Sequence, residues 1–225
     1  MADSGPAHRK DIDSLEFLFY NKNNLSWGGN RIAAYEYGRI AKLDENLRAA
    51  GLPEELIAEI MEGGEGVRKT ADPRVKADWL GATMLRMDER LEPEVRHAVR
   101  VACACCLGGK RQELVKAVAK RGGTLEERVH AANQTRLVFG HSVTLEEDGC
   151  ILVCFAPDDT LENRCVCLPK ASQPISPTYC YCCGGHIKHH LQIALDRQVS
   201  VEVRSSALSS GGKQPCSFYF TLLDD

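Results

Sequence analysis

The stretch YCYCCGGHIKHHLQIAL, residues 179–195, combines a helical pattern of apolar residues with three cysteines and three histidines. Four apolar residues lie on one side of the predicted helix: Ile187, Leu191, Ala194 and Leu195. Thiol and imidazole groups three or four positions apart lie side by side on a helix, and this spacing is typical of zinc ligands. Two such rows border the apolar side: Cys183, His186 and His190, or Cys182, His186 and His189.

Two further cysteine clusters precede this stretch. Residues 103–109 repeat its pattern of C-x-C-C and then Gly-Gly, at the end of a helix predicted to open at Pro93. Cys165 and Cys167 lie two positions apart on a predicted strand, residues 164–168, and so share one face. Because glycine lets the backbone approach a bound ion closely, the repeated device predicts a binding site.

We expect the three clusters to converge on one metal or thiolate site. The candidate metal ligands are Cys103, Cys105, Cys106, Cys165, Cys167, Cys180, Cys182, Cys183, His186 and His190. Zinc, the first expectation, takes four ligands, and the clusters supply eight cysteines. One site could use a subset, for instance Cys165, Cys167, Cys180 and Cys183. Alternatively, two sites exist, or the thiolates hold an iron–sulfur cluster.

The order of elements predicts an α+β fold. Helical patterns cover residues 32–50, 53–61, 72–91, 93–106, 111–121 and 124–133. Short strand patterns follow at 137–145, 151–155 and 164–168, and a hairpin with clear alternation spans 199–222. We therefore expect a helical region, residues 1–135, packed on a module of antiparallel strands with one long helix, residues 136–225. The two regions could form one continuous domain.

Composition restricts the class of protein. The chain has 225 residues, a net charge of −3 and no basic stripe, which argues against nucleic-acid binding. Neither a signal peptide nor a membrane-spanning segment is recognisable, so the predicted location is the cytoplasm. Adjacent cysteines in a reducing compartment indicate metal binding or thiol chemistry rather than disulfides. The isolated Cys150, Cys154 and Cys216 are expected to be small buried residues.

The last 45 residues resemble the end of the 4-vinyl reductase domain family and of the related 2-amino-thiazoline-4-carboxylate hydrolase-like group. The resemblance rests on a cysteine-led helix, VSVEVRSSAL at 199–208, and a Gly-x-x-x-Cys-x-Phe element formed by Gly212, Cys216 and Phe218. It implies an α+β domain that binds a small molecule, often with a cysteine-linked site. The whole chain also resembles an uncharacterised, cysteine-rich bacterial family.

Three functions are therefore expected. The first is a protein that binds a metal or senses a small molecule, and it could form a homodimer. The second is a thiol-dependent hydrolase of small cyclic or thiol-containing substrates, with Cys183 as nucleophile and His186 as base. The third is a structural adaptor whose cysteines are simply buried.

Overall fold

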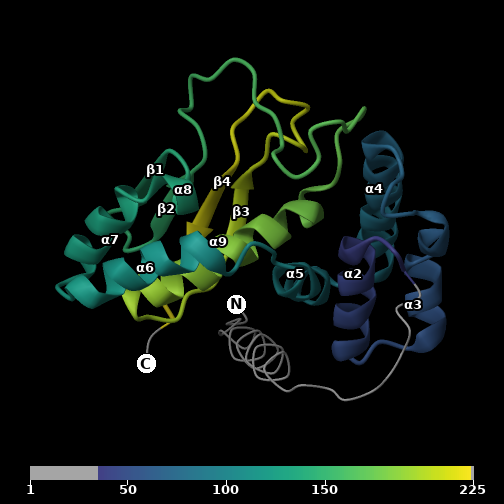
Figure 1. Ribbon diagram of the computed structural model, residues 1–225, viewed down its shortest axis with the longest axis horizontal. Helices are drawn as coiled ribbons and strands as arrows, with labels where there is room; N and C mark the ends of the chain where they lie inside the picture. Colours follow the sequence, from purple (N-terminus) through teal and green to yellow (C-terminus); the bar gives the residue numbers. More distant parts are fainter. Residues whose placement is uncertain (1–34, 224–225) are drawn as a thin grey trace, which may run out of the picture.

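The computed structural model describes residues 35–223 (Figure 1). The start of the helix predicted over residues 32–50 lies outside the described residues. The helices are α2 (Gly38–Ala49), α3 (Glu54–Ile60), α4 (Pro73–Arg90), α5 (Pro93–Ala102), α6 (Gly109–Arg121), α7 (Leu125–Asn133), α8 (Arg136–Phe139) and α9 (Tyr181–Leu195). Short 3-10 turns, η1 (Gly64–Gly66) and η2 (Pro177–Cys180), follow α3 and precede α9.

Local sequence signals fix most helix ends close to where they are predicted. The exception is α5, which ends at Ala102 and not at the predicted Cys106, because Cys106 takes a positive φ of 62° that a right-handed helix does not accommodate. The Asp72 side chain accepts a hydrogen bond from the Arg74 amide, and Pro73 occupies the first position of α4. Thr124 and Glu127 form the predicted capping box at the start of α7. None of the described helices combines the length and apolarity needed to cross a membrane.

Four strands form one antiparallel sheet in the order β1-β2-β4-β3. They are β1 (Ser142–Leu145), β2 (Ile151–Cys154), β3 (Glu202–Ser205) and β4 (Ser217–Phe220). The two predicted hairpins form, and their inner strands β2 and β4 pair with each other. Helices and this antiparallel sheet together make an α+β fold, as predicted.

Two predicted strand segments are wrong. Residues 164–168 form a loop, because the Leu168 amide donates to the sulfur of Cys165 rather than to a neighbouring strand. Residues 137–139 belong to α8, because the amides of Val138 and Phe139 both donate to the carbonyl of Thr135. In both places a local hydrogen bond replaces the sheet bond that the apolar pattern suggested.

Helix α9 lies between two hydrophobic cores. One core gathers residues of α2 to α5 together with Leu168, Ile175 and Tyr179. The other gathers residues of α6 and α7, the sheet and the apolar side of α9. Figure 1 shows α9 between the sheet and the helices α2 to α4. Both cores thus combine residues from before and after position 135.

The second Gly-Gly pair serves packing inside α9. A Cβ atom on Gly185 would collide with the backbone of Val101 in α5, and one on Gly184 would lie 2.9 Å from a methyl group of Val201. Since no side chain fits at Gly185, α5 and α9 cross with their backbones in close approach. This crossing brings the end of α5 to the start of α9.

The substitution Gly185→Ala should therefore destabilise the fold by about 1–3 kcal/mol, the usual effect of overpacking a core. Gly81→Ala is the matched control, because Gly81 also lies inside a helix but its Cβ would only touch Ile175 at 3.4 Å. There, alanine should be neutral or stabilising by up to about 1 kcal/mol. Urea unfolding followed by circular dichroism gives both values, and equal effects at the two positions would contradict the close crossing.

Candidate functional site: two cavities lined by cysteine

Eight cysteines line two neighbouring cavities, four in each. The large thiol cavity, of about 490 Å³, is lined by Cys103, Cys105, Cys167 and Cys182. The small thiol cavity, of about 200 Å³, is lined by Cys165, Cys180, Cys183 and Cys216. Tyr179 lines both cavities. The Cys167 and Cys183 sulfurs, one from each set, lie 3.8 Å apart.

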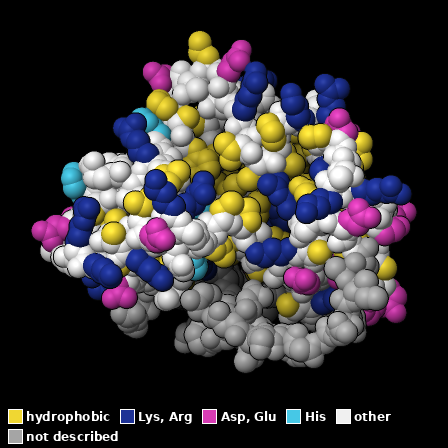
Figure 2. Space-filling view, viewed as in Figure 1, with side chains coloured by type: hydrophobic (Ala, Val, Ile, Leu, Met, Phe, Trp, Pro, Cys, Tyr) yellow, Lys and Arg dark blue, Asp and Glu magenta, His cyan; other side chains and the backbone are white. Residues whose placement is uncertain are grey.

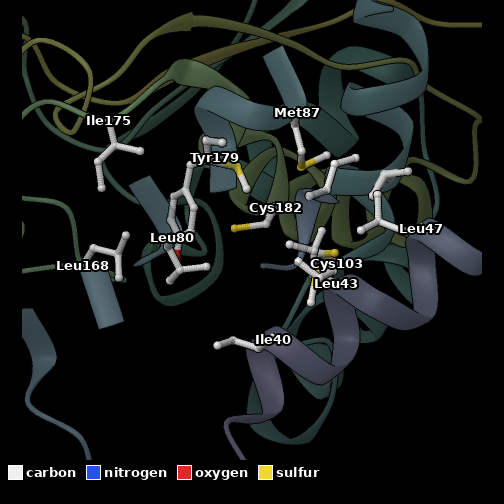
Figure 3. Packing of buried hydrophobic residues seen from close by; sticks show 14 of the residues in the cluster. Ile40, Leu43, Leu47, Leu80, Met87, Cys103, Leu168, Ile175, Tyr179 and Cys182 are labelled. Carbon is white, nitrogen blue, oxygen red and sulfur yellow. The ribbon is translucent and has the colours of Figure 1, made fainter. Parts of the chain in front are cut away.

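The start of α9 divides its cysteines between the two cavities. Cys182 and Cys183 are neighbours in the first turn, and successive side chains of a helix point about 100° apart. Cys182 therefore lies on the wall of the large cavity and Cys183 on the wall of the small one. Figure 3 shows the Cys182 side chain between Tyr179 and Cys103 in the first core.

A buried guanidinium group stands beside the large cavity. Arg100 is only 3% exposed, and it donates hydrogen bonds to the Tyr179 carbonyl, at 3.2 Å, and to the Cys182 sulfur. No carboxylate of residues 35–223 forms an ion pair with it. Arg39 lies nearby and donates to the Cys167 carbonyl, at 2.9 Å, and to the Tyr179 hydroxyl, at 3.0 Å. A buried charge needs a partner of opposite sign, and here thiolates are the nearest candidates.

The acidity of the central thiols follows from these contacts. A hydrogen bond from Cys183, aided by Arg100 and Arg39, lowers the pKa of Cys182 to about 6 against the opposing effect of burial. The same Cys183 hydrogen bond, with Arg39 and Arg100, lowers the pKa of Cys167 to about 7. The pKa of Cys183 itself is raised well above the ordinary value, because its S–H is the hydrogen-bond donor to the Cys167 and Cys182 sulfurs and because the residue is buried. Near neutral pH, the negative charge therefore belongs to the large cavity.

Backbone amides surround two sulfurs of the small cavity. The Cys165 sulfur accepts hydrogen bonds from the amides of Leu168, at 3.4 Å, and Cys167. The Cys216 sulfur accepts from the amides of Ala207, at 3.3 Å, and Leu208. Such donors stabilise a thiolate and are the kind of outer contact that orients metal ligands.

The remaining two thiols of the small cavity are held by side chains. The Cys180 sulfur lies 2.9 Å from the Ser206 hydroxyl, and Cys183 lies against Cys167. Burial raises the pKa of Cys165 to about 11 and that of Cys180 to about 12. Without a metal these thiols are protonated, so a metal ion that binds here must displace their protons.

The histidines of α9 hold a loop and do not face the thiols. The Nδ1 atom of His186 lies 3.1 Å from the Cys105 carbonyl oxygen, and the Nε2 atom of His190 lies 3.3 Å from that of Cys106. Neither ring lines either cavity. Burial lowers the pKa of both imidazoles, to about 4 for His190. They therefore fix the loop after α5 against α9 as neutral rings.

The predicted ligand set is thus brought together in part. Seven of its members line the cavities: Cys103, Cys105, Cys165, Cys167, Cys180, Cys182 and Cys183. Cys106 lies past the end of α5 and is exposed, although its sulfur is 3.8 Å from that of Cys105. Among the described residues no hydrogen bond joins Cys183 to His186, so this nucleophile–base pair stays a prediction.

Cys216 is the functional candidate that residue spacing missed. It was expected to be a small buried residue, yet it lines the small cavity immediately before β4. Only the family resemblance, with its Gly-x-x-x-Cys-x-Phe element, pointed to this residue. Cys150 and Cys154 line neither thiol cavity, and only Cys154 is fully buried.

The thiols are close but are not yet arranged as ligands. Among residues 35–223, no three side chains of His, Cys, Asp or Glu are already placed to hold one metal ion. A cysteine has one rotatable side-chain bond that moves its sulfur, so rotation about Cα–Cβ is the change that binding would require. The site is therefore a set of converging thiols rather than a preformed ligand shell.

These features define an α+β protein with paired, thiol-lined cavities beside a buried arginine. Residues 43–223 match the model of the Family of unknown function (DUF6144), and this match covers most of the chain. The chain therefore belongs to that family. No curated protein and no solved structure matches it.

The lowered pKa of Cys182 predicts selective alkylation. In the metal-free protein, iodoacetamide should modify Cys182 or its neighbour Cys167 well below pH 8, because only these two thiols have their pKa lowered by the S–H of Cys183, by Arg100 and by Arg39. Rates measured against pH by peptide mass spectrometry check this, and Cys182→Ser should remove most of the low-pH reaction. Uniform alkylation that begins only above pH 8 would contradict the assigned acidity.

Proposed function

We propose that this protein binds one zinc ion through Cys165, Cys180, Cys183 and Cys216. The observation that carries the proposal is the small thiol cavity itself, where four thiols from three segments line one partly enclosed space and two of the sulfurs accept hydrogen bonds from amides. Zinc in structural sites takes four ligands, and Cys₄ is one of its common sets. The proposal leaves out the histidines of the predicted ligand set. It also differs from the subset of Cys165, Cys167, Cys180 and Cys183 given as an example from the sequence, because Cys216 replaces Cys167.

The amide contacts favour a metal over simple burial of hydrophobic thiols. A protonated thiol is a weak acceptor, so an amide turned toward it gains little from the hydrogen bond. A thiolate bound to zinc is a strong acceptor, and the same amides then stabilise its charge. Arg164 on the cavity wall adds a positive charge beside the anionic zinc–thiolate complex.

The origin of the ligands suggests what the zinc does. Cys165 belongs to the long loop after β2, Cys180 and Cys183 flank the start of α9, and Cys216 precedes β4. One ion would therefore join a loop, a helix and a strand that meet at the border of the two cores. Since metal binding couples to folding, loss of zinc should loosen this border. All eleven cysteines are free, which fits a role in the reducing cytoplasm.

A second candidate function is thiol-dependent hydrolysis of a small substrate, and a specific observation favours it. Cys182 has a lowered pKa and lines the large cavity beside Arg100 and Arg39. A thiolate in such surroundings is a nucleophile, as the resemblance to the 2-amino-thiazoline-4-carboxylate hydrolase-like group would imply. Here Cys182 is better suited than Cys183, whose pKa is raised. Zinc binding and this activity would use different cavities but share Cys183, because its S–H lowers the pKa of Cys182 and zinc would take the same residue as a thiolate.

Metal analysis of anaerobically purified protein tests the zinc proposal. The wild type should contain one zinc per chain and show no absorbance band near 400 nm. Cys216→Ser should bind zinc at least about tenfold more weakly. Removing only a group that hydrogen-bonds to a metal ligand already lowers metal affinity by about tenfold or more, and this variant removes the ligand itself. Cys150→Ser is the matched control, a half-buried cysteine outside both cavities, and it should keep the zinc.

Two results would overturn the proposal. Wild-type protein without stoichiometric zinc, or full zinc retention in Cys216→Ser, would remove its basis. A brown protein with iron and sulfide would assign the thiols to an iron–sulfur cluster in place of zinc.

A further inference from the structure

We propose that the large thiol cavity binds a small organic carboxylate, which Arg39 and Arg100 recognise. This ligand would bind apart from the zinc ion. Arg39 belongs to α2 and Arg100 to α5, and both line the large thiol cavity, whereas the four proposed zinc ligands line the small one. The proposal rests on charge, on one unpaired buried N–H group and on the shape of the cavity.

Positive charge dominates the lining of the cavity. Arg39, Lys42, Lys69 and Arg100 all line it, against the single carboxylate of Glu36. Within residues 35–223, no carboxylate forms an ion pair with any of the four cations. On the face drawn in Figure 2, Lys and Arg side chains gather around apolar groups near the centre.

The thiolates do not cancel this charge. Even with both Cys182 and Cys167 ionised, the cations outnumber the anions of the lining. An enclosed space with excess positive charge and apolar walls attracts anions, because the interaction is screened less there than in bulk water.

Arg100 supplies the second, independent observation. Its side chain is buried and lines the cavity, and its Nε–H has no hydrogen-bond partner. Leaving a buried charged donor without an acceptor destabilises the protein. A carboxylate accepts from guanidinium in a two-pronged geometry that includes such an N–H. Because protein covers the Nε atom, Arg100 must turn toward the cavity for a ligand of this class to satisfy the unpaired group.

Arg39 is already held in place for the same ligand. Its two hydrogen bonds, to the Cys167 carbonyl and the Tyr179 hydroxyl, fix one side of the guanidinium group. Its remaining donors are available to an occupant of the cavity. Binding therefore needs little ordering of this side chain, which favours affinity.

The cavity is larger than an inorganic anion requires. Its volume of about 490 Å³ lies in the range of small-molecule sites. Leu80, Tyr37 and Tyr179 form apolar parts of the wall, and they suit the carbon body of a ligand. Charge at one part of the wall and apolar groups at another select a compact organic acid rather than phosphate.

Calorimetric titration of the full chain tests the proposal with a series of carboxylates from acetate to benzoate. Benzamide is the neutral isostere of benzoate, and inorganic phosphate is the purely ionic probe. We expect saturable binding that strengthens toward benzoate, with benzamide and phosphate at least tenfold weaker. Arg39→Gln should weaken benzoate binding at least tenfold, while its zinc content stays that of the wild type.

Controls keep the result interpretable. Lys116→Gln changes an exposed lysine on α6, away from the cavity, and should bind benzoate like the wild type. Lys69→Gln changes an exposed residue on the cavity wall, so it should fold normally and weaken binding severalfold even if Arg39→Gln proves unstable. No saturable binding of any carboxylate, equal affinity for benzamide, or unchanged affinity in Arg39→Gln and Lys69→Gln would overturn the proposal.

Discussion

The close crossing of α5 and α9 at Gly185 is the constraint on which the rest of the structure depends. Because no side chain fits between Gly185 and Val101, the end of α5 reaches the start of α9. This contact brings Cys103 and Cys105 to the wall that carries Cys182, and it sets the loop carbonyls after α5 against the imidazoles of His186 and His190. The sequence of α9 suggested a helix that carries ligands. In the structure, α9 also packs between the two hydrophobic cores.

The two thiol cavities differ in how they treat negative charge. In the large cavity, guanidinium groups lower the pKa of Cys182 and Cys167, and the lining keeps an excess of positive charge. In the small cavity, burial raises the pKa of Cys165 and Cys180, and only a metal ion would make these thiols anionic. The first environment suits an anionic ligand or a nucleophile, and the second suits a metal. Cys183, between the two, donates its proton toward the large cavity and is available as a ligand in the small one only after that proton leaves.

The parts of this fold that depend on local chemistry could be predicted from the sequence. Proline, capping residues and terminal glycines place the helix ends, and alternation places β3 and β4, since these signals act over a few residues. The loop at 164–168 could not be predicted, because the Leu168 amide donates its hydrogen bond to the Cys165 sulfur and not to a neighbouring strand. The convergence of the clusters was expected, but the division of the thiols depends on how α9 is rotated against α5. The role of the histidines also depends on that packing, because a ring three or four residues from a thiol can equally bind a carbonyl on another segment.

X-ray absorption at the zinc edge of the purified protein tests the central claim most directly. An all-thiolate site predicts four sulfur neighbours at about 2.3 Å and no nitrogen in the first shell. Nitrogen neighbours at about 2.0–2.1 Å would return the histidines of α9 to the metal and contradict the assignment to Cys165, Cys180, Cys183 and Cys216.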